Sequence, residues 1–438
     1  MVEDVIYSIL FYNCIYFYKL SRYHSYLNSA KQILQQYKGE EPFSSFLKEF
    51  FSGDKKYGSK DRKMISHLCY CYFRLGKSLP EVPIEERILI GLFLCSAEPN
   101  ELLEQTKPEW NQSVTLLLEE KCSMLNAQFS MFDVFPWKEE LTEGIDHIKF
   151  SESFFVQPDL FLRVRPGFEK SVKTKLNAAG IKFSEISATC LSLPNATKIE
   201  MLIELDKEAV VQDYNSQQSA AFMKSAILNL PAGRQGLQSE IKVWDCCAGS
   251  GGKSLLAFDI NPNVDLTVSD SRESIIRNLK KRFISAGVKK YSSFVTDLAR
   301  THSLPDSYRG TTHLPIAIGT PFDLIICDAP CTGSGTWTRT PEQLCFFDEK
   351  KIGQYASLQK KIIANVIPHL KADGYFLYIT CSVFKKENEE NVDFIKQQFH
   401  LDLIKIPARM TGSDGELLKG YDKKADTLFA ALFRKGVK

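Results

Sequence analysis

The spacing of apolar residues divides the chain into three regions. From about residue 29 to residue 125, apolar residues recur three or four positions apart, as in Ile33, Leu34 and Tyr37, and this spacing is typical of amphipathic helices. Between about 150 and 210 the pattern changes to the short strand-like runs "LFLRV" and "KIEMLIEL", with one helical segment that ends at Gly180. From Ile241 onward, short apolar runs alternate with helical segments. This alternation predicts a parallel sheet whose two faces are covered by helices.

The third region predicts a Rossmann-like α/β domain with seven strands. A chain of 438 residues is longer than one compact core usually supports, so several domains are expected. We predict a helical domain over 1–145, a small α+β module over 146–210 and the Rossmann-like domain over 211–438. The strands are expected at 241–246, 264–270, 292–297, 322–328, 374–381, 402–406 and 427–433.

Charge and cysteine content restrict the function only weakly. The chain has 55 Lys and Arg against 53 Asp and Glu, so a nucleic acid would have to bind local basic patches. Trp337 is interpreted either as a base-stacking ring or as a core aromatic residue. Candidate contacts to a nucleic-acid backbone are Arg163, Arg165, Lys170, Lys173, Lys175 and Arg339.

The sequence gives no support for a metal site, a membrane span or an export signal. The 12 cysteines include no Cys-x-x-Cys pair and the 7 histidines are scattered, so no metal is expected and a reducing cytoplasm fits best. The apolar stretch "VIYSILFYNCIYFYKL" follows Glu3 and Asp4 rather than a basic segment. We interpret it as an aromatic-rich first helix or a misassigned start, because it is short for a bilayer and has no small-residue cleavage site.

Candidate chemistry gathers at the carboxyl ends of the predicted strands. Ligands of an open α/β sheet bind at this edge. A single acidic residue there is often only a turn residue, but five successive strands that end in a carboxylate or a thiol favour a binding site. These residues are Asp245 with Cys246, then Asp270, Asp297, Asp328 and Cys381.

The glycine-rich segment "DCCAGSGGKS" after the first strand is typical of a loop that binds a nucleotide-like ligand. A Walker A loop needs a glycine where this chain has Cys247, and a dinucleotide fingerprint needs one where it has Ser254. S-adenosylmethionine fits better. Asp270, about 20 residues beyond the loop, is expected to hold the ribose hydroxyls, and Asp297 is expected to contact the adenine.

Four segments resemble the motifs of the Sun/Fmu (RsmB-like) RNA cytosine-C5 methyltransferases. They are "VQDYNSQQSA", "DCCAGSGGK", "DAPCTGSG" and "TCSVFKKENEEN", in this order. The resemblance covers roughly residues 150–435, and Ser250 stands where that family usually has proline. More loosely, the first helices resemble a NusB-type RNA-binding domain and the α+β module an RRM-like one.

The resemblance implies a role for each motif residue. Carbon 5 of cytosine becomes nucleophilic only after a thiolate adds to carbon 6, and the resemblance gives this role to Cys381. Cys331 would assist product release, Asp328 would hydrogen-bond the cytosine edge, and Lys253 would lower the pKa of a nearby thiol. Asn388 and Glu389 would organise the loop after Cys381. The residues that would bind S-adenosylmethionine are Cys247, Ala248, Gly249, Ser250, Gly251, Gly252, Lys253, Asp270, Arg277, Asp297 and Asp328.

The sequence therefore predicts a cytoplasmic, monomeric RNA methyltransferase that takes part in rRNA processing. Small-subunit rRNA is the preferred substrate by analogy of fold, with tRNA as the other RNA considered. Two alternatives remain open. The segment "GKS" at 252–254 leaves room for a P-loop ATPase, and the helical domain for a non-catalytic RNA-binding assembly factor.

Overall fold

The computed structural model describes residues 22–54, 56–125, 129–230, 241–300, 321–407 and 416–436. The chain forms two compact units, each of which includes a segment from elsewhere in the sequence. The helical unit consists of 1–138, 146–157 and 337–348, and the sheet unit of 139–145, 158–336 and 349–438. The apolar stretch near the N-terminus lies outside the described residues. The three-domain boundaries expected from the sequence stay a prediction.

The helical unit is built from amphipathic helices around an aromatic core. Phe43, Phe73 and Phe93 are fully buried there, as are Phe135 and Phe150. Residues 22–36 are helical. The helices that follow are α2 (Phe43–Gly53), α3 (Ser59–Arg74), α4 (Ile84–Cys95), α5 (Glu101–Thr106), α6 (Pro108–Gln112), α7 (Leu118–Met124), α8 (Met131–Val134), α9 (His147–Glu152) and α15 (Pro341–Phe346).

The segment 337–348 packs into the core of the helical unit although it lies far along the chain. Trp337 is 2% exposed, and its ring centroid lies 4.7 Å from that of Phe347 and 6.3 Å from that of Trp137. Lys77 Nζ donates a hydrogen bond to the Cys345 carbonyl at 2.8 Å. Trp337 is therefore a core aromatic residue, and the prediction that it stacks on a base is wrong.

A small antiparallel sheet with one helix occupies the start of the sheet unit. Its strands are β1 (Leu160–Val164), β2 (Ser184–Glu185), β3 (Cys190–Leu193) and β4 (Ala209–Val211), in the spatial order β2-β3-β1-β4. Leu162 and Val164 of β1 pack against Val172 and Leu176 of α10 (Glu169–Ala178). The structure thus contains the expected α+β arrangement.

The large sheet has the seven predicted strands, and β11 (Leu417–Leu418) adds a short antiparallel pairing with β12. Neighbours from β7 to β9 are parallel, and β12 is antiparallel to β9. The spatial order is β10-β12-β9-β8-β5-β6-β7. The strands are β5 (Lys242–Asp245), β6 (Asp265–Asp270), β7 (Tyr291–Val295), β8 (Phe322–Asp328), β9 (Leu370–Thr380), β10 (Leu401–Ile404) and β12 (Leu428–Lys435).

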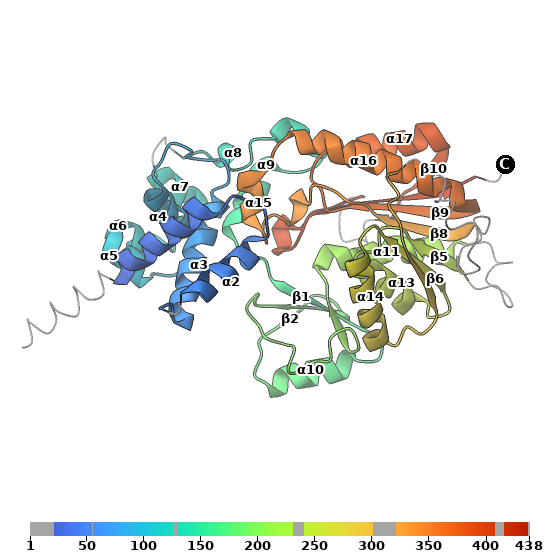
Figure 1. The fold of residues 1–438 in the computed structure, drawn as a ribbon, viewed down its shortest axis with the longest axis horizontal. Coiled ribbons are helices and arrows are strands. Elements are labelled where there is room, and N and C mark those ends of the chain that lie inside the picture. The colour runs from blue at the N-terminus through green and yellow to red at the C-terminus, as the bar shows by residue number, and fades with distance from the viewer. Residues whose placement is uncertain are drawn as a thin grey trace, which may run out of the picture. The chain divides into compact units, whose positions relative to one another are not determined.

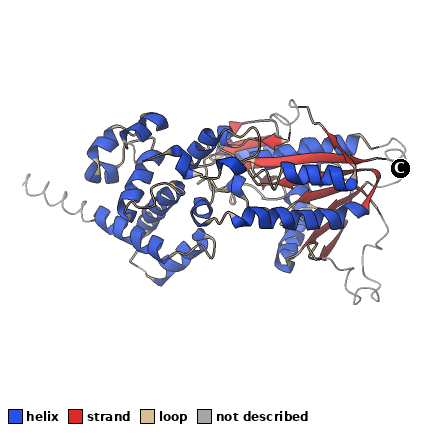
Figure 2. Cartoon of the chain, turned by 90° about the horizontal axis from the view of Figure 1, so that it is seen from above, coloured by secondary structure: helices blue, strands red, loops and turns tan. Residues whose placement is uncertain are grey.

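Helices cover both faces of this sheet (Figures 1 and 2). Apolar residues of α11 (Tyr214–Leu228), α13 (Gly252–Ile260) and α14 (Glu273–Ala286) form one core with the sheet. Residues of α16 (Lys350–Val366) and α17 (Glu389–Phe399) form the other. The predicted Rossmann-like fold class is confirmed. From β5 the chain continues to β6 and β7 on one side of the sheet, whereas from β8 it continues to β9 on the other side. The position between β5 and β8 is therefore a topological switch point, where ligands of α/β folds bind.

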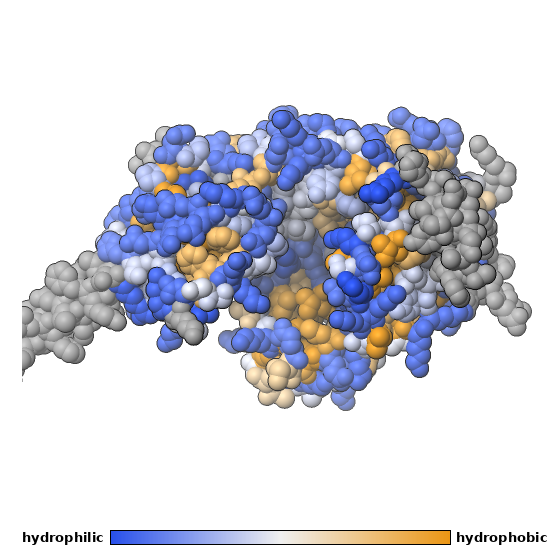
Figure 3. All heavy atoms as spheres, viewed as in Figure 1, coloured by the Kyte–Doolittle hydropathy of each residue, from blue (hydrophilic) through white to orange (hydrophobic). Residues whose placement is uncertain are grey.

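Hydrophilic side chains cover most of the face of the helical unit that Figure 3 shows. Among the described residues, no helix combines the length and the apolar character needed to cross a bilayer.

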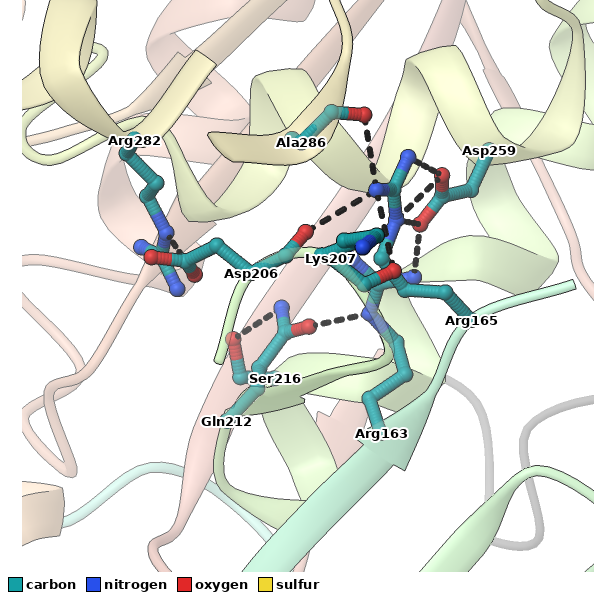
Figure 4. A network of polar contacts seen from close by, with 9 residues as sticks. All are labelled: Arg163, Arg165, Asp206, Lys207, Gln212, Ser216, Asp259, Arg282 and Ala286. Atoms are coloured by element: carbon teal, nitrogen blue, oxygen red, sulfur yellow. Dashed lines mark hydrogen bonds and ion pairs between the residues drawn. The ribbon is translucent and has the colours of Figure 1, made fainter. Parts of the chain in front are cut away.

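Arg163 of β1 and Arg165, just beyond its end, form a buried ion-pair network instead of an exposed basic patch (Figure 4). Arg163 and Arg165 are 5% and 7% exposed and both pair with Asp259 of α13. Arg165 Nη1 also donates to the carbonyls of Asp206 and Ala286, at 2.9 Å and 2.8 Å. The prediction that these arginines contact a nucleic-acid backbone is wrong, because their guanidinium groups tie the small sheet to α13.

Candidate active site

The glycine-rich segment forms a tight loop between β5 and α13. Gly249 and Gly251 have φ angles of +52° and +87°, in the left-handed region that favours glycine. A Cβ atom on Gly251 would lie 2.9 Å from the ring of Phe283, whereas one on Gly249 would have no neighbour within 4 Å. The loop therefore packs closely on α14 at one glycine and borders open space at the other, as a ligand-binding loop requires.

Asp270, at the end of β6, closes this loop from the neighbouring strand. The Gly249 amide donates a hydrogen bond to Asp270 Oδ2 at 3.1 Å, and the Arg272 amide donates to Oδ1 at 2.9 Å. Burial raises the pKa of Asp270, but the hydrogen bonds from Arg272 and Gly249 outweigh it and hold this pKa below its usual value. The carboxylate is thus charged and well placed to accept hydroxyl donors.

Two other predicted cofactor residues lie in more exposed positions. Asp297, beyond the end of β7, accepts a hydrogen bond from the Ala299 amide at 3.0 Å and pairs with Arg300. Arg277 lies on α14, where its exposed guanidinium is 3.9 Å from the Glu273 carboxylate. Among the described residues, Arg277 makes no polar contact with the glycine loop, so its role stays a prediction.

Lys253, in the first turn of α13, is buried against Asp328 at the end of β8. Its Nζ lies 3.2 Å from Asp328 Oδ2 and donates to Ser216 Oγ at 2.7 Å. Burial lowers the pKa of Lys253, but Asp328 and Cys381 raise it, and the net shift is upward. The ammonium therefore keeps its charge. Ser216 belongs to the "VQDYNSQQSA" segment. The sequence analysis noted this segment as a motif but gave Ser216 no role.

The structure brings Cys331 and Cys381 together. The Cys381 amide donates a hydrogen bond to Cys331 Sγ at 3.3 Å. Both residues are partly exposed, and the Ala329 amide donates to the Ile379 carbonyl at 2.9 Å, which ties the ends of β8 and β9 together. Two thiols from different motifs thus lie at one edge of the sheet.

Both thiols hold their protons at neutral pH. Burial, together with Asp328 and Cys331, raises the pKa of Cys381 well above its usual value, and Lys253 acts against this shift. Burial and Glu387 raise the pKa of Cys331 to about 12. Lys253 therefore lowers the pKa of Cys381, as expected, but desolvation and the neighbouring acidic groups raise this pKa by more.

Glu387 organises both cysteine loops, and the sequence analysis did not single it out. Its carboxylate is fully buried and accepts hydrogen bonds from the Thr332 amide at 3.0 Å, the Thr332 hydroxyl at 2.6 Å and the Ser382 hydroxyl at 2.5 Å. Gln359 of α16 donates to the same carboxylate at 2.9 Å. The residues after Cys331 and Cys381 are thus fixed by one acid. Its position inside "TCSVFKKENEEN" was the available signal.

Asn388 and Glu389 connect the same loop to residues 139–145. Asn388 Nδ2 donates to the Thr142 hydroxyl at 2.7 Å and to the Ser382 carbonyl at 2.9 Å. The Glu143 amide donates to Glu389 Oε1 at 2.9 Å. These contacts support the predicted organising role of both residues.

Asp245 and three cysteines lie behind the loop. Asp245 is fully buried, and its Oδ2 accepts a hydrogen bond from the Ser254 hydroxyl at 2.6 Å. The expectation that Asp245 lines the open edge is wrong. Cys246, Cys247 and Cys327 have sulfur atoms within 4.8 Å of one another, a cluster that spacing along the sequence does not reveal.

Comparison with known proteins identifies the sheet domain. Residues 236–434 match the model of the family described as "16S rRNA methyltransferase RsmB/F". We call these residues the RsmB/F region, because they are similar to that family. The RsmB/F region contains the glycine loop, Asp328, Cys331 and Cys381, so the predicted resemblance is confirmed.

The relatives of the RsmB/F region include enzymes named for rRNA and for tRNA. The chain is 28% identical over 175 residues to human tRNA (cytosine(72)-C(5))-methyltransferase NSUN6, covering 40% of this chain and 36% of that protein. It is 25% identical over 224 residues to ribosomal RNA small subunit methyltransferase B of Yersinia enterocolitica, covering 47% and 49%. The matched parts thus span between a third and a half of these relatives.

Solved structures share the fold. A protein named PH0851 matches with a TM-score of 0.63 at 18% identity, over 95% of this chain and 99% of that one. NSun6 from Pyrococcus horikoshii, solved with SFG, matches with a TM-score of 0.52 at 15% identity, over 67% and 94%. The fold around the RsmB/F region is therefore that of these proteins.

Proposed function

We propose that this protein transfers a methyl group from S-adenosylmethionine to carbon 5 of a cytosine in RNA. The observation that carries the proposal is the meeting of two thiols with a lysine–aspartate pair at the carboxyl edge of the sheet. The RsmB/F match and the names of the relatives support the same chemistry. A nucleophile beside an acid and a cation is the arrangement that covalent catalysis on a pyrimidine needs.

Cys381 is proposed as the nucleophile. Its thiolate adds to carbon 6 of the cytosine, and the electron pair of the carbon 5–carbon 6 double bond becomes available at carbon 5. Since burial and Asp328 raise the pKa of Cys381, the thiol has to lose its proton when the substrate binds. Lys253, which lowers this pKa, favours that ionisation.

Asp328 and Cys331 are proposed to handle the ring and its release. Asp328 is 28% exposed, so its carboxylate can reach a bound base and hydrogen-bond the cytosine edge. After methylation, a base near the adduct takes the proton from carbon 5, the carbon 5–carbon 6 double bond forms again, and the bond between carbon 6 and Cys381 breaks with its electron pair returning to the sulfur as thiolate. Cys331, whose sulfur contacts the Cys381 amide, is placed to assist this elimination.

The glycine loop and the strand ends fit S-adenosylmethionine. The open space at Gly249 and the charged carboxylate of Asp270 are the features on which this fit rests. When bound, the cofactor supplies an electrophilic methyl group. Lys253 is held by Asp328 and Ser216 rather than aimed away from the protein, which favours this ligand over the triphosphate of the ATPase alternative.

The target base has to leave its stack, because carbon 6 is shielded inside a helix. Small-subunit rRNA stays the preferred substrate, supported by the family description, and tRNA the second, supported by the name of the human relative. The proposal includes action as a monomer in the cytoplasm and an RNA-binding role for the helical unit.

Incubation with radiolabelled S-adenosylmethionine and total RNA tests the proposal. We expect label in RNA, and 5-methylcytidine after digestion to nucleosides and mass spectrometry. Label on adenosine, on DNA or on protein alone would contradict the reaction. Separation of the labelled RNA by size distinguishes small-subunit rRNA from tRNA.

A further inference from the structure

Cys246 and Cys247, at the start of the glycine loop, form a compact donor set with Cys327 that takes no part in the proposed covalent chemistry, although Cys247 is also one of the predicted cofactor-loop residues. Cys246 follows β5 and is 1% exposed, Cys327 lies in β8 and is 0% exposed, and Cys247 is partly exposed. Their sulfur atoms all lie within 4.8 Å of one another. Cys331 and Cys381, the thiols of the proposed reaction, are not members of this group.

The backbone fixes two of the three thiols side by side. Asp245 pairs with Ile326 in the parallel register of β5 and β8, and the Cys246 amide donates to the Ile326 carbonyl at 2.9 Å. Cys246 and Cys327 are therefore the next residues of two hydrogen-bonded neighbouring strands. Because these strands lie in the middle of the sheet, the positions of the two sulfur atoms are set by the fold and not by a mobile loop.

We propose that Cys246, Cys247 and Cys327 bind a divalent d10 metal ion of the Zn²⁺ type. Tetrahedral zinc with Zn–S bonds of about 2.3 Å places its sulfurs about 3.8 Å apart. The observed cluster, with sulfurs no more than 4.8 Å apart, needs only a small contraction to reach this geometry. Three thiolates select zinc or another soft ion over magnesium or calcium. The fourth position is left for water on the side of the partly exposed Cys247.

The acidic surroundings favour a divalent cation there. Asp245 precedes Cys246, and Asp328 follows Cys327 in the chain. A dication would offset the negative charge that three thiolates acquire beside these two acidic residues. The ion would link the ends of β5 and β8, directly behind the glycine loop. The sequence argument against a metal considered only Cys-x-x-Cys and histidine spacing, so it could not find donors from two strands 80 residues apart.

The test is a titration of the reduced, metal-free full-length protein with Cd²⁺, which replaces Zn²⁺ and gives an ultraviolet thiolate charge-transfer absorption. We expect one equivalent to bind with an absorption typical of three thiolates. Cys246→Ala and Cys327→Val should each weaken binding by more than about tenfold, since even changes around a metal ligand have effects of that size. Cys122→Ala, which removes a partly exposed thiol of the helical unit, should bind as the wild type does.

A second measurement does not depend on spectroscopy. Zn²⁺ should raise the melting temperature of the wild type and of Cys122→Ala, because a ligand that binds only the folded state stabilises it, and it should not raise that of Cys246→Ala. Equal Cd²⁺ affinity in wild type and folded Cys246→Ala would overturn the proposal. So would a disulfide within the cluster in protein purified under reducing conditions. Both measurements are independent of methyl transfer, so they stand or fall separately from the proposed reaction.

Discussion

The Cys381 amide donates a hydrogen bond to the sulfur of Cys331, at 3.3 Å. This contact joins the ends of two neighbouring strands and brings the two thiols of the proposed reaction to one edge of the sheet. The proposed reaction gives the two cysteines different roles, so their substitutions should have different effects on methylation. Cys381 would form the covalent bond to RNA, whereas Cys331 would act only after that bond exists.

Cys381→Ala should abolish methylation and form no adduct. Cys331→Ala should add to the RNA but fail to release it, so a protein–RNA complex should survive denaturing electrophoresis. The measurement compares both variants with wild type on labelled RNA. Cys345→Ala, which changes a partly exposed thiol of the helical unit, serves as control. Adduct in the Cys381→Ala variant, or its absence from both, would refute the assignment of roles.

Alkylation of Cys381 by iodoacetamide should be slow at neutral pH and accelerate with rising pH. Its pKa lies well above the usual value because of burial and Asp328, so the thiolate fraction should grow about tenfold per pH unit through the alkaline range. Lys253 lowers this pKa, so Lys253→Met should slow the reaction at each pH. Mass spectrometry of the peptide that contains Cys381 measures the rate. A pH-independent rate, or a faster one in Lys253→Met, would show that the pKa argument fails.

Glu387→Gln should lower both kcat and the free energy of unfolding, and the activation free energy calculated from kcat should change more than the free energy of unfolding. The carboxylate accepts from Thr332, Ser382 and Gln359, and an amide group would turn a donor toward some of these donors. Each buried group left without a partner costs about 1–3 kcal/mol, and the loops after both cysteines would shift. Chemical denaturation and kcat measure the two effects. Glu390→Gln, at the first turn of α17 beside this segment, is the control. Unchanged kcat in Glu387→Gln would contradict the organising role.

The contribution of Asp245 to the stability of the protein should fall as pH rises from about 4 to about 7. Burial raises the pKa of Asp245 to about 7, against about 3.9 in an unfolded chain. Between these values the folded state retains a proton that the unfolded state has lost, so each pH unit removes about 1.4 kcal/mol. The stabilisation that comes from this retained proton is fully present below the pKa of the unfolded state. It is lost as pH rises through the pKa of the folded state.

Asp245→Asn should flatten this slope, because an asparagine oxygen can accept the Ser254 hydrogen bond without ionising. Urea denaturation at pH 5 and pH 7 measures the difference between the variant and the wild type. Asp297→Asn, with a side chain 43% exposed, should leave the slope unchanged. A slope that is identical in wild type and Asp245→Asn would contradict the raised pKa.

The sequence predicted the elements and the strand-end residues better than it predicted burial and contacts. Strand β8 was recognisable because "LIIC" is a continuous apolar run between Asp323 and Asp328, and alternation with helices then predicted that the strands run parallel. Asp328 and Cys381 follow from that order, since parallel strands bring their carboxyl ends to one edge.

Side-chain partners across large sequence separations were not predictable in this way. Arg163 and Arg165 looked like an exposed pair until Asp259, 96 and 94 residues away, supplied their counter-charge. Trp337 was ambiguous because the segment around it packs in the helical unit and not in the domain that surrounds it in the sequence. Glu387 was not singled out, since nothing local indicates that four donors converge on it.

Asp259→Ala should destabilise the protein strongly. Asp259 is the counter-ion of two guanidinium groups, and its side chain is 6% exposed. Burial lowers the pKa of Arg163 while Asp259 raises it, so loss of the carboxylate leaves two buried cations without compensation. Breaking a buried pair in this way costs about 3–5 kcal/mol.

The matched control is Asp393→Ala, because Asp393 is 61% exposed and lies 3.6 Å from Lys396. An exposed pair of this kind contributes about 1 kcal/mol or less. Urea denaturation of both variants should therefore separate them by about 2 kcal/mol or more. If the two lost equal stability, the Arg163–Asp259–Arg165 network would not be what holds the small sheet to α13.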